Sequence, residues 1–185
     1  MHLPVFDNYR LAGGTALGLQ IGHRKSIDID LFGVEEIEIE NVIDSLNDFG
    51  KLKILSRSRN INIFSLNGIK IDLVRYKYPW ISEMVLLENI RMASTVDIAA
   101  MKINGITARG SVKDFIDLYY LFKMHSLSEM VNYFQSKYHD GSIFLALKSL
   151  TYFDDAEKQE LPFLFEKITW PEMKKAILLE YEKLL

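Results

Sequence analysis

The feature that most constrains the fold is an acidic strand that follows a glycine-rich turn. In residues 26–32 the apolar residues alternate with Asp28 and Asp30, so both carboxylates lie on one face of a predicted strand. They are roughly 7 Å apart along the backbone. Two like charges at this spacing destabilise an otherwise apolar strand unless a cation lies between them. The pattern predicts a divalent metal ion at Asp28 and Asp30; the alternative is a solvated outer face of an antiparallel sheet.

The turn is Gly13-Gly14-Thr15, between an apolar strand and an apolar helix. Free backbone N–H groups at a helix start bind anions well, so a phosphate is the expected ligand, and Thr15 is expected to cap the helix. No Gly-Lys-Ser/Thr follows, which excludes a P-loop, and the glycine spacing excludes a dinucleotide fingerprint. A metal ion beside a phosphate indicates a nucleotide.

Two residues further along the chain extend this candidate site. Asp72 follows the Asn67-Gly68 hairpin signal and lies on the polar face of its strand, where it would add a third carboxylate for Mg²⁺ or Mn²⁺. Any polar residue could occupy that position, which leaves its role open. Lys102 lies on an otherwise apolar helix stripe, so its ammonium must reach water or an anion such as a phosphate.

Four charged residues gather around the start of the next predicted helix: Arg109, Lys113, Asp114 and Asp117. They could complete the site. Alternatively, Asp114 is a helix cap, and Lys113 forms an ordinary helical ion pair with Asp117.

The composition is that of a soluble globular protein, with 49% hydrophobic and 25% charged residues among 185. A net charge of −3 argues against a uniformly basic nucleic-acid-coating protein, although short basic clusters such as His23-Arg24-Lys25, expected to be solvated, could contact phosphates. The chain has no cysteine, so a reducing cytoplasm is the expected compartment. No apolar run approaches ~18 residues, and the N-terminus lacks signal-peptide features, so we expect no membrane association.

The periodicities predict an α+β fold with a small mixed or antiparallel sheet, two flanking helices and a helical C-terminal part. Strands are expected at 9–12, 26–32, 51–57, 60–66 and 69–75, and flanking helices at 16–21 and 35–49. After a loop at 76–92, only helical patterns follow, the first two opened by Ser94-x-x-Asp97 and Ser111-x-x-Asp114. We therefore expect an α/β core over residues 1–92 and a helical region over residues 93–185 packed on it.

Two blocks of the sequence carry a resemblance to a known family. The first is Leu11-Ala-Gly-Gly-Thr-Ala-Leu with Arg24-Lys-Ser-Ile-Asp-Ile-Asp-Leu-Phe, and the second begins at Asp97-Ile-Ala-Ala-Met-Lys and ends at residue 119. In this order they resemble the AbiEii/AbiGii-type nucleotidyltransferase toxins of the DNA polymerase beta-like nucleotidyltransferase superfamily. The resemblance spans about residues 9–122, and the C-terminal third matches no motif of the family.

The resemblance implies a site built from both blocks. The residues expected to bind the nucleotide are Gly13, Gly14, Thr15, Ser26 and Lys102. The residues expected to bind the metal ion are Asp28 and Asp30, with Asp72 beside them. The residues expected to take part in catalysis are Asp28, Asp30, Lys102 and Asp114 or Asp117. Many relatives of that family have Gly-Ser where this chain has Gly-Gly-Thr. The side-chain hydroxyl is therefore retained in this chain, on Thr15, but at a different position in the motif.

The function implied is the Mg²⁺- or Mn²⁺-dependent transfer of a nucleoside monophosphate from an NTP to an acceptor, with pyrophosphate leaving. The expected acceptor is RNA, such as a tRNA 3′ end, and the expected role is the toxin of a toxin–antitoxin pair, with a cognate antitoxin as partner. Two alternatives stay open: an antibiotic-type enzyme acting on a small molecule, and a non-catalytic scaffold with the same fold.

Overall fold

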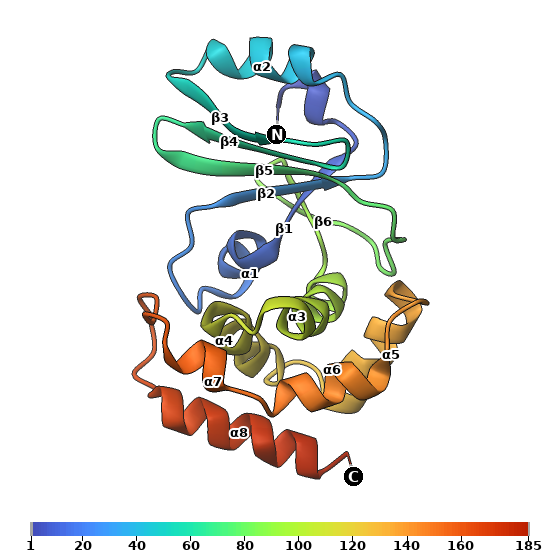
Figure 1. Ribbon diagram of the computed structural model, residues 1–185, viewed down its shortest axis with the longest axis vertical. Coiled ribbons are helices and arrows are strands. Elements are labelled where there is room, and N and C mark those ends of the chain that lie inside the picture. The colour runs from blue at the N-terminus through green and yellow to red at the C-terminus, as the bar shows by residue number, and fades with distance from the viewer. Residues whose placement is uncertain (1, 185) are drawn as a thin grey trace.

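The structure, a computed structural model, describes residues 2–184 and places a mixed sheet above a group of helices (Figure 1). The strands are β1 (Tyr9–Ala12), β2 (Ile29–Gly33), β3 (Leu52–Arg57), β4 (Ile61–Leu66), β5 (Ile69–Arg75), β6 (Val85–Leu87) and β7 (Ile90–Met92). The helices are α1 (Gly13–Ile21), α2 (Ile39–Asn47), α3 (Thr95–Arg109), α4 (Val112–Leu121), α5 (Leu127–Lys137), α6 (Ile143–Leu150), α7 (Asp154–Glu157) and α8 (Trp170–Glu182), with a 3-10 turn at Pro4–Phe6.

The sheet has seven strands in the order β3-β4-β5-β2-β1-β7-β6. The β3-β4-β5 meander is antiparallel, as is β1 with β2, whereas β2 with β5 and β1 with β7 are parallel. This confirms the predicted α+β fold with a mixed sheet, flanking helices and a helical C-terminal part. The helix predicted over 35–49 is shorter, because α2 covers only Ile39–Asn47.

The sequence prediction of a loop over 76–92 is wrong, since β6 and β7 form a hairpin there. Each strand has only three residues, and the turn between them is Glu88-Asn89, with φ of 47° and 64°. Hairpin turns with positive φ at both positions usually carry Asn-Gly or Asp-Gly. Because this turn carries Glu-Asn instead, its sequence does not indicate a hairpin.

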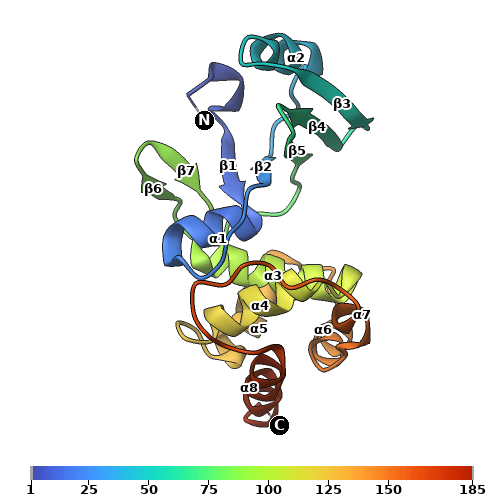
Figure 2. The ribbon, with the colours of Figure 1, turned by 90° about the vertical axis from the view of Figure 1, so that its left-hand side faces the viewer.

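Helix α3 joins the sheet part to the other helices. Its residues Ile98, Ala99, Ala100 and Ile103 are fully buried. Helix α1 lies between the sheet and α3 and α4 in both views (Figures 1 and 2). The division into residues 1–92 and 93–185 stays a prediction.

A buried ion pair fastens the segment after β5 to α3 and α5. Lys137 Nζ lies 2.6 Å from Asp97 Oδ1, and neither side chain is exposed. The Asp97 carboxylate also accepts the backbone N–H groups of Ile81 and Ser82 at 3.1 and 3.2 Å. Ser94 caps α3 by accepting the Asp97 N–H, as its sequence pattern predicts.

In residues 2–184, no helix has the length and apolar content needed to cross a membrane.

Candidate active site

A polar pocket of about 290 Å³ lies where β2, β5 and the start of α1 face α3 and α4. Of the residues predicted from sequence, its lining contains Gly13, Gly14, Ser26, Asp28, Asp30, Asp72, Lys102 and Asp114. Thr15 and Asp117 lie behind this lining, each in contact with residues that belong to it. The structure thus brings parts of both sequence blocks to one pocket, while the roles of the individual residues stay predictions.

Asp30 and Asp72 are neighbours across the parallel β2–β5 pair, where they are in register. Burial, and then the nearby charge of Asp72, raise the pKa of the Asp30 carboxyl above its ordinary value. Asp72 Oδ2 accepts a hydrogen bond from Lys70 Nζ at 2.6 Å, whereas Oδ1 is buried and has no hydrogen-bond partner in residues 2–184. Two adjacent carboxylates with an unsatisfied oxygen form a site that favours a cation.

The carboxylates do not form a closed metal cage. Within residues 2–184, no three His, Asp or Glu side chains are gathered closely enough to hold a metal ion among themselves. Mg²⁺ typically uses one or two carboxylates and takes its other ligands from water and substrate phosphates. The donor set of Asp30 and Asp72 fits such an open site, and the participation of Asp28 stays a prediction.

Gly13 and Gly14 allow the backbone at the start of α1 to approach the charged side chains. Gly13 has φ of +67°, and a Cβ there would lie 2.4 Å from Asp30 Oδ2. A Cβ on Gly14 would lie 2.0 Å from Arg24 Nη2. The residue before α1 is Ala12, which has no side chain able to cap the helix. The first N–H groups of α1 therefore stay available at the pocket, as an anion site requires.

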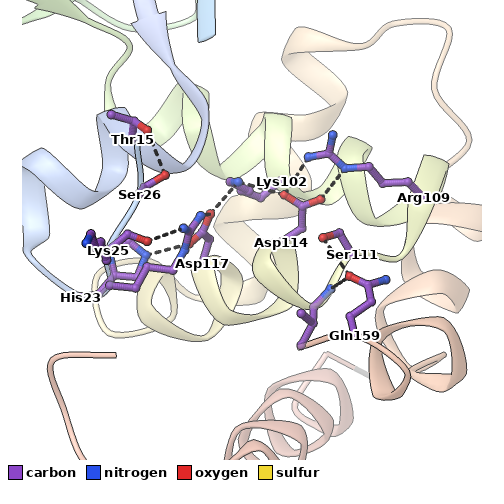
Figure 3. Close-up of polar contacts among 12 residues, drawn as sticks. Thr15, His23, Lys25, Ser26, Lys102, Arg109, Ser111, Asp114, Asp117 and Gln159 are labelled. Atoms are coloured by element: carbon purple, nitrogen blue, oxygen red, sulfur yellow. Dashed lines mark hydrogen bonds and ion pairs between the residues drawn. The ribbon is translucent and has the colours of Figure 1, made fainter. Parts of the chain in front are cut away.

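The prediction that Thr15 caps a helix is wrong, because α1 begins two residues earlier, at Gly13. Thr15 Oγ1 instead lies 2.9 Å from Ser26 Oγ (Figure 3). It also contacts the carbonyl oxygen of Asp28. The hydroxyl thus ties the segment that carries Ser26 and Asp28 to the first turn of α1.

Asp117 is the centre of a buried charge network beneath the pocket (Figure 3). Its carboxylate lies 2.7 Å from His23 Nε2, accepts Arg24 Nε at 2.6 Å, and lies 2.6 Å from Lys102 Nζ. Burial alone would raise the pKa of Asp117, but the charge of Lys102 and the hydrogen bonds from His23 and Arg24 hold that pKa well below its ordinary value. Asp117 is therefore a carboxylate that positions three basic side chains.

Asp114 extends this network to the pocket. It accepts Lys102 Nζ at 2.9 Å and Arg109 Nε at 2.8 Å. Burial opposes ionisation of Asp114, yet Lys102 and Arg109 hold its pKa below the ordinary value. The alternative pairing of Lys113 with Asp117 is wrong, because Asp117 faces inward to Lys102, whereas Lys113 is exposed. The carboxylate of Asp114 is likewise engaged with Lys102 and Arg109 rather than with a helix end.

Sequence reasoning missed the roles of His23, Arg24 and Lys70. His23 and Arg24 are buried, with 2% and 5% exposure, although the sequence favoured a solvated basic loop. Their partner Asp117 is more than 90 residues away, so no local pattern reveals the contact. Lys70 carried a usable signal, because residues two apart on a strand share a face and Lys70 precedes Asp72 by two.

The comparison with protein families gives a match over residues 1–81, to the family described as "Nucleotidyl transferase AbiEii toxin, Type IV TA system". The chain is also 37% identical over 172 residues to "Uncharacterized protein aq_aa25" of Aquifex aeolicus (strain VF5), which covers 85% of this chain and 79% of that protein.

Solved structures share the fold at low sequence identity. MenT4, described as nucleotidyltransferase toxin Rv2826c from Mycobacterium tuberculosis H37Rv, gives a TM-score of 0.64 at 13% identity, covering 97% of this chain and 76% of that one. A putative nucleotidyltransferase from Helicobacter pylori gives 0.57 at 19% identity, covering 97% and 89%. JHP933 from Helicobacter pylori gives 0.56 at 17% identity, covering 97% and 86%.

The family match over residues 1–81 contains the block that carries Gly13, Gly14, Asp28 and Asp30, and it confirms the family predicted from sequence; the second block, residues 97–119, lies outside the matched residues. The chain therefore belongs to the AbiEii family of nucleotidyltransferase toxins and is a nucleotidyltransferase.

Proposed function

We propose that this nucleotidyltransferase transfers a nucleoside monophosphate from an NTP to RNA, such as a tRNA 3′ end, in a reaction that requires Mg²⁺ or Mn²⁺. The observation that carries the proposal is the division of charge within the pocket. In-register carboxylates on β2 and β5 form one wall and favour a cation, while basic groups around them suit a triphosphate. The basic groups of the lining are Arg24, Lys70, Lys102, Arg109 and Lys113.

The metal ion would be held by Asp30 and Asp72, with Asp28 as a further ligand. When bound, such an ion neutralises triphosphate charge and lowers the pKa of an attacking hydroxyl. The unpartnered buried oxygen of Asp72 supports this assignment, as does the in-register position of Asp30 beside it.

The triphosphate would be bound by the free N–H groups at Gly13 and Gly14 and by Lys102 and Arg109. Both side chains are oriented by Asp114, which limits the conformations they can adopt before a substrate arrives. In the reaction, the acceptor hydroxyl oxygen bonds to the α-phosphorus, the bond from that phosphorus to the bridging oxygen of the β-phosphate breaks, and pyrophosphate and a proton leave.

The wider role follows from the family. Its members are described as toxins of a toxin–antitoxin system, and we propose that this chain acts in the cytoplasm as such a toxin, opposed by a cognate antitoxin. We further propose that residues 1–92 contribute the metal-binding carboxylates and residues 93–185 contribute Lys102 and Asp114.

The test is incubation of the protein with each labelled NTP and total RNA, with Mg²⁺, with Mn²⁺ or with EDTA. Metal-dependent labelling of RNA by the wild type, and no labelling by Asp30→Asn, is the expected result. Labelling of small hydroxylated compounds but not of RNA would favour the antibiotic-type alternative. No labelling, together with no rise in melting temperature on adding metal and NTP, would favour the scaffold.

A further inference from the structure

An extended segment between α7 and α8 contacts two residues of the polar pocket's lining, Ser111 and Arg24. We call this segment, residues 159–166, the rim strap. Figure 2 shows it crossing in front of α3 and α4 before the chain turns down into α8. It comes from the C-terminal third of the chain, which carries none of the sequence motifs, and the mechanism above assigns it no role.

Hydrogen bonds hold the rim strap at both ends. At one end, the Gln159 Oε1 atom accepts the Val112 N–H at 3.1 Å and lies 3.3 Å from the hydroxyl of Ser111, a residue of the pocket lining (Figure 3). At the other end, the Phe163 carbonyl oxygen accepts the Lys25 N–H at 2.9 Å, and the Phe165 N–H donates to the His23 carbonyl oxygen at 3.1 Å. The backbone is therefore fixed from the start of α4 to the segment before β2.

The side chains of the rim strap alternate between solvent and protein. Leu161, Phe163 and Phe165 are 48%, 65% and 63% exposed, whereas Pro162 and Leu164 between them are partly buried. The two phenylalanine rings lie 5.3 Å apart at an interplanar angle of 80°. A segment held by backbone hydrogen bonds to His23 and Lys25 thus presents two adjacent aromatic rings to solvent.

A lysine without an ion-pair partner in residues 2–184 lies beside each anchor. Lys25 is exposed and adjoins the backbone bonds to Phe163, and Lys113 is exposed and adjoins the Val112 bond to Gln159. The rim therefore combines exposed aromatic rings with an unpaired lysine at each end, while of the strap's two carboxylates Glu166 pairs with Lys123 and Glu160 is exposed. A polyanion with exposed bases complements both features, whereas an apolar protein surface complements only the rings.

We propose that the rim strap binds the acceptor: unpaired bases of a single-stranded RNA end stack on Phe163 and Phe165, and its phosphates contact Lys25 and Lys113. Base stacking on aromatic side chains with lysines along the backbone is the general way in which proteins hold single-stranded nucleic acid. The inference rests on the proposed RNA acceptor, and it places that acceptor on the rim strap, with Lys113 of the pocket lining at one end.

The test measures fluorescence anisotropy of a labelled single-stranded oligoribonucleotide, and of the same strand annealed to its complement, without NTP or metal. The wild type is expected to prefer the single strand. Phe163→Leu/Phe165→Leu keeps an apolar surface and is expected to weaken single-strand binding by about tenfold for each ring lost. Phe163→Tyr/Phe165→Tyr should restore it. Phe144→Ala, which removes a ring that is 72% exposed on α6, is the matched control and should leave binding unchanged.

The lysines are tested by the dependence of affinity on salt. Lys25→Ala and Lys113→Ala should each reduce the slope of log K against log salt by about 0.7, while the phenylalanine variants leave the slope unchanged. Thermal melting of every variant separates lost binding from lost fold.

Three outcomes would overturn the inference: equal binding of single strand and duplex, wild-type affinity in the leucine variant, or no binding of either RNA by the wild type. If the leucine variant bound RNA as tightly as the wild type, the two exposed rings would be assigned to contact with a protein surface instead. Because the assay uses neither NTP nor metal, these outcomes are distinct from a failure of the transfer reaction itself.

Discussion

Lys102 and Asp117 form an ion pair beneath the polar pocket, with 2.6 Å between Nζ and Oδ2 and 6% and 0% of the two side chains exposed. Removing the charge of Asp117 would leave Lys102 and Arg24 buried without their shared carboxylate. Breaking one side of a buried pair typically costs about 3–5 kcal/mol. We therefore expect Asp117→Asn to lower the free energy of unfolding by about this amount, measured by urea denaturation. Asp154→Asn, on the exposed start of α7, is the control and should change stability by about 0.5 kcal/mol or less.

The same network makes stability depend on acid pH. The pKa values of Asp114 and Asp117 are lowered in the folded protein, so below the ordinary Asp pKa the unfolded chain binds more protons than the folded one. The two carboxylates contribute fully to stability above the pKa that Asp has in the unfolded chain. This contribution is lost as the pH falls through their lower pKa values in the folded protein. Melting temperature should therefore fall as the pH drops below about 4. If the melting temperature of Asp117→Asn fell with pH as much as that of the wild type, the pH dependence would not come from this network.

Asp30→Asn separates the catalytic and structural roles of the acidic pair. Replacing one of two adjacent carboxylates relieves repulsion with Asp72, so the metal-free variant should be as stable as the wild type or more stable by up to about 1 kcal/mol. Transfer activity should be lost, because a metal ligand has been removed. Added Mg²⁺ at a hundred times its dissociation constant should stabilise the wild type by about 2.7 kcal/mol and the variant by less. Calorimetric melting with and without Mg²⁺ measures both effects; equal stabilisation by the metal would exclude Asp30 as a ligand.

Gly13→Ala tests the close approach of α1 to the acidic strand. Its Cβ would lie 2.4 Å from Asp30 Oδ2, and the residue has φ of +67°. Gly22→Ala is a matched control, since Gly22 has φ of +63° and a Cβ there would meet nothing within 4 Å. Both substitutions should destabilise the protein by about 1–2 kcal/mol through backbone strain. Only Gly13→Ala should also abolish NTP binding, measured by equilibrium dialysis with labelled nucleotide. Loss of NTP binding in both variants would assign the effect to strain alone.

Local sequence patterns predicted the elements whose signals lie within a few residues. The Asn67-Gly68 turn between β4 and β5 and the Ser94 cap of α3 are of this kind. The strand predicted over 26–32 is correct only in part, because β2 begins at Ile29 and Asp28 precedes it. The turn at Glu88-Asn89 was missed because its residues are uncommon in such turns, although their positive φ values are the usual ones.

The candidate site was harder to predict, because its contacts join distant residues. The sequence indicated that Lys102 needs an anion, but Asp114 and Asp117 satisfy it in the folded chain before any phosphate is bound. Arg24 is buried against Asp117, and the two residues meet because α4 packs against α1. Such pairings are properties of the tertiary structure, and one sequence does not reveal them.

The two buried ion pairs also have a consequence for how the chain could be divided. The carboxylate of each pair also contacts residues that precede residue 93: Asp117 contacts His23 and Arg24, and Asp97 accepts the backbone N–H groups of Ile81 and Ser82. A cut between the sheet and the helices would leave His23 and Arg24 without their carboxylate in one fragment and would remove hydrogen-bond donors of Asp97 and Asp117 from the other. We therefore expect that residues 1–92 and residues 93–185, although they differ in architecture, would each be less stable when separated than they are in the intact chain.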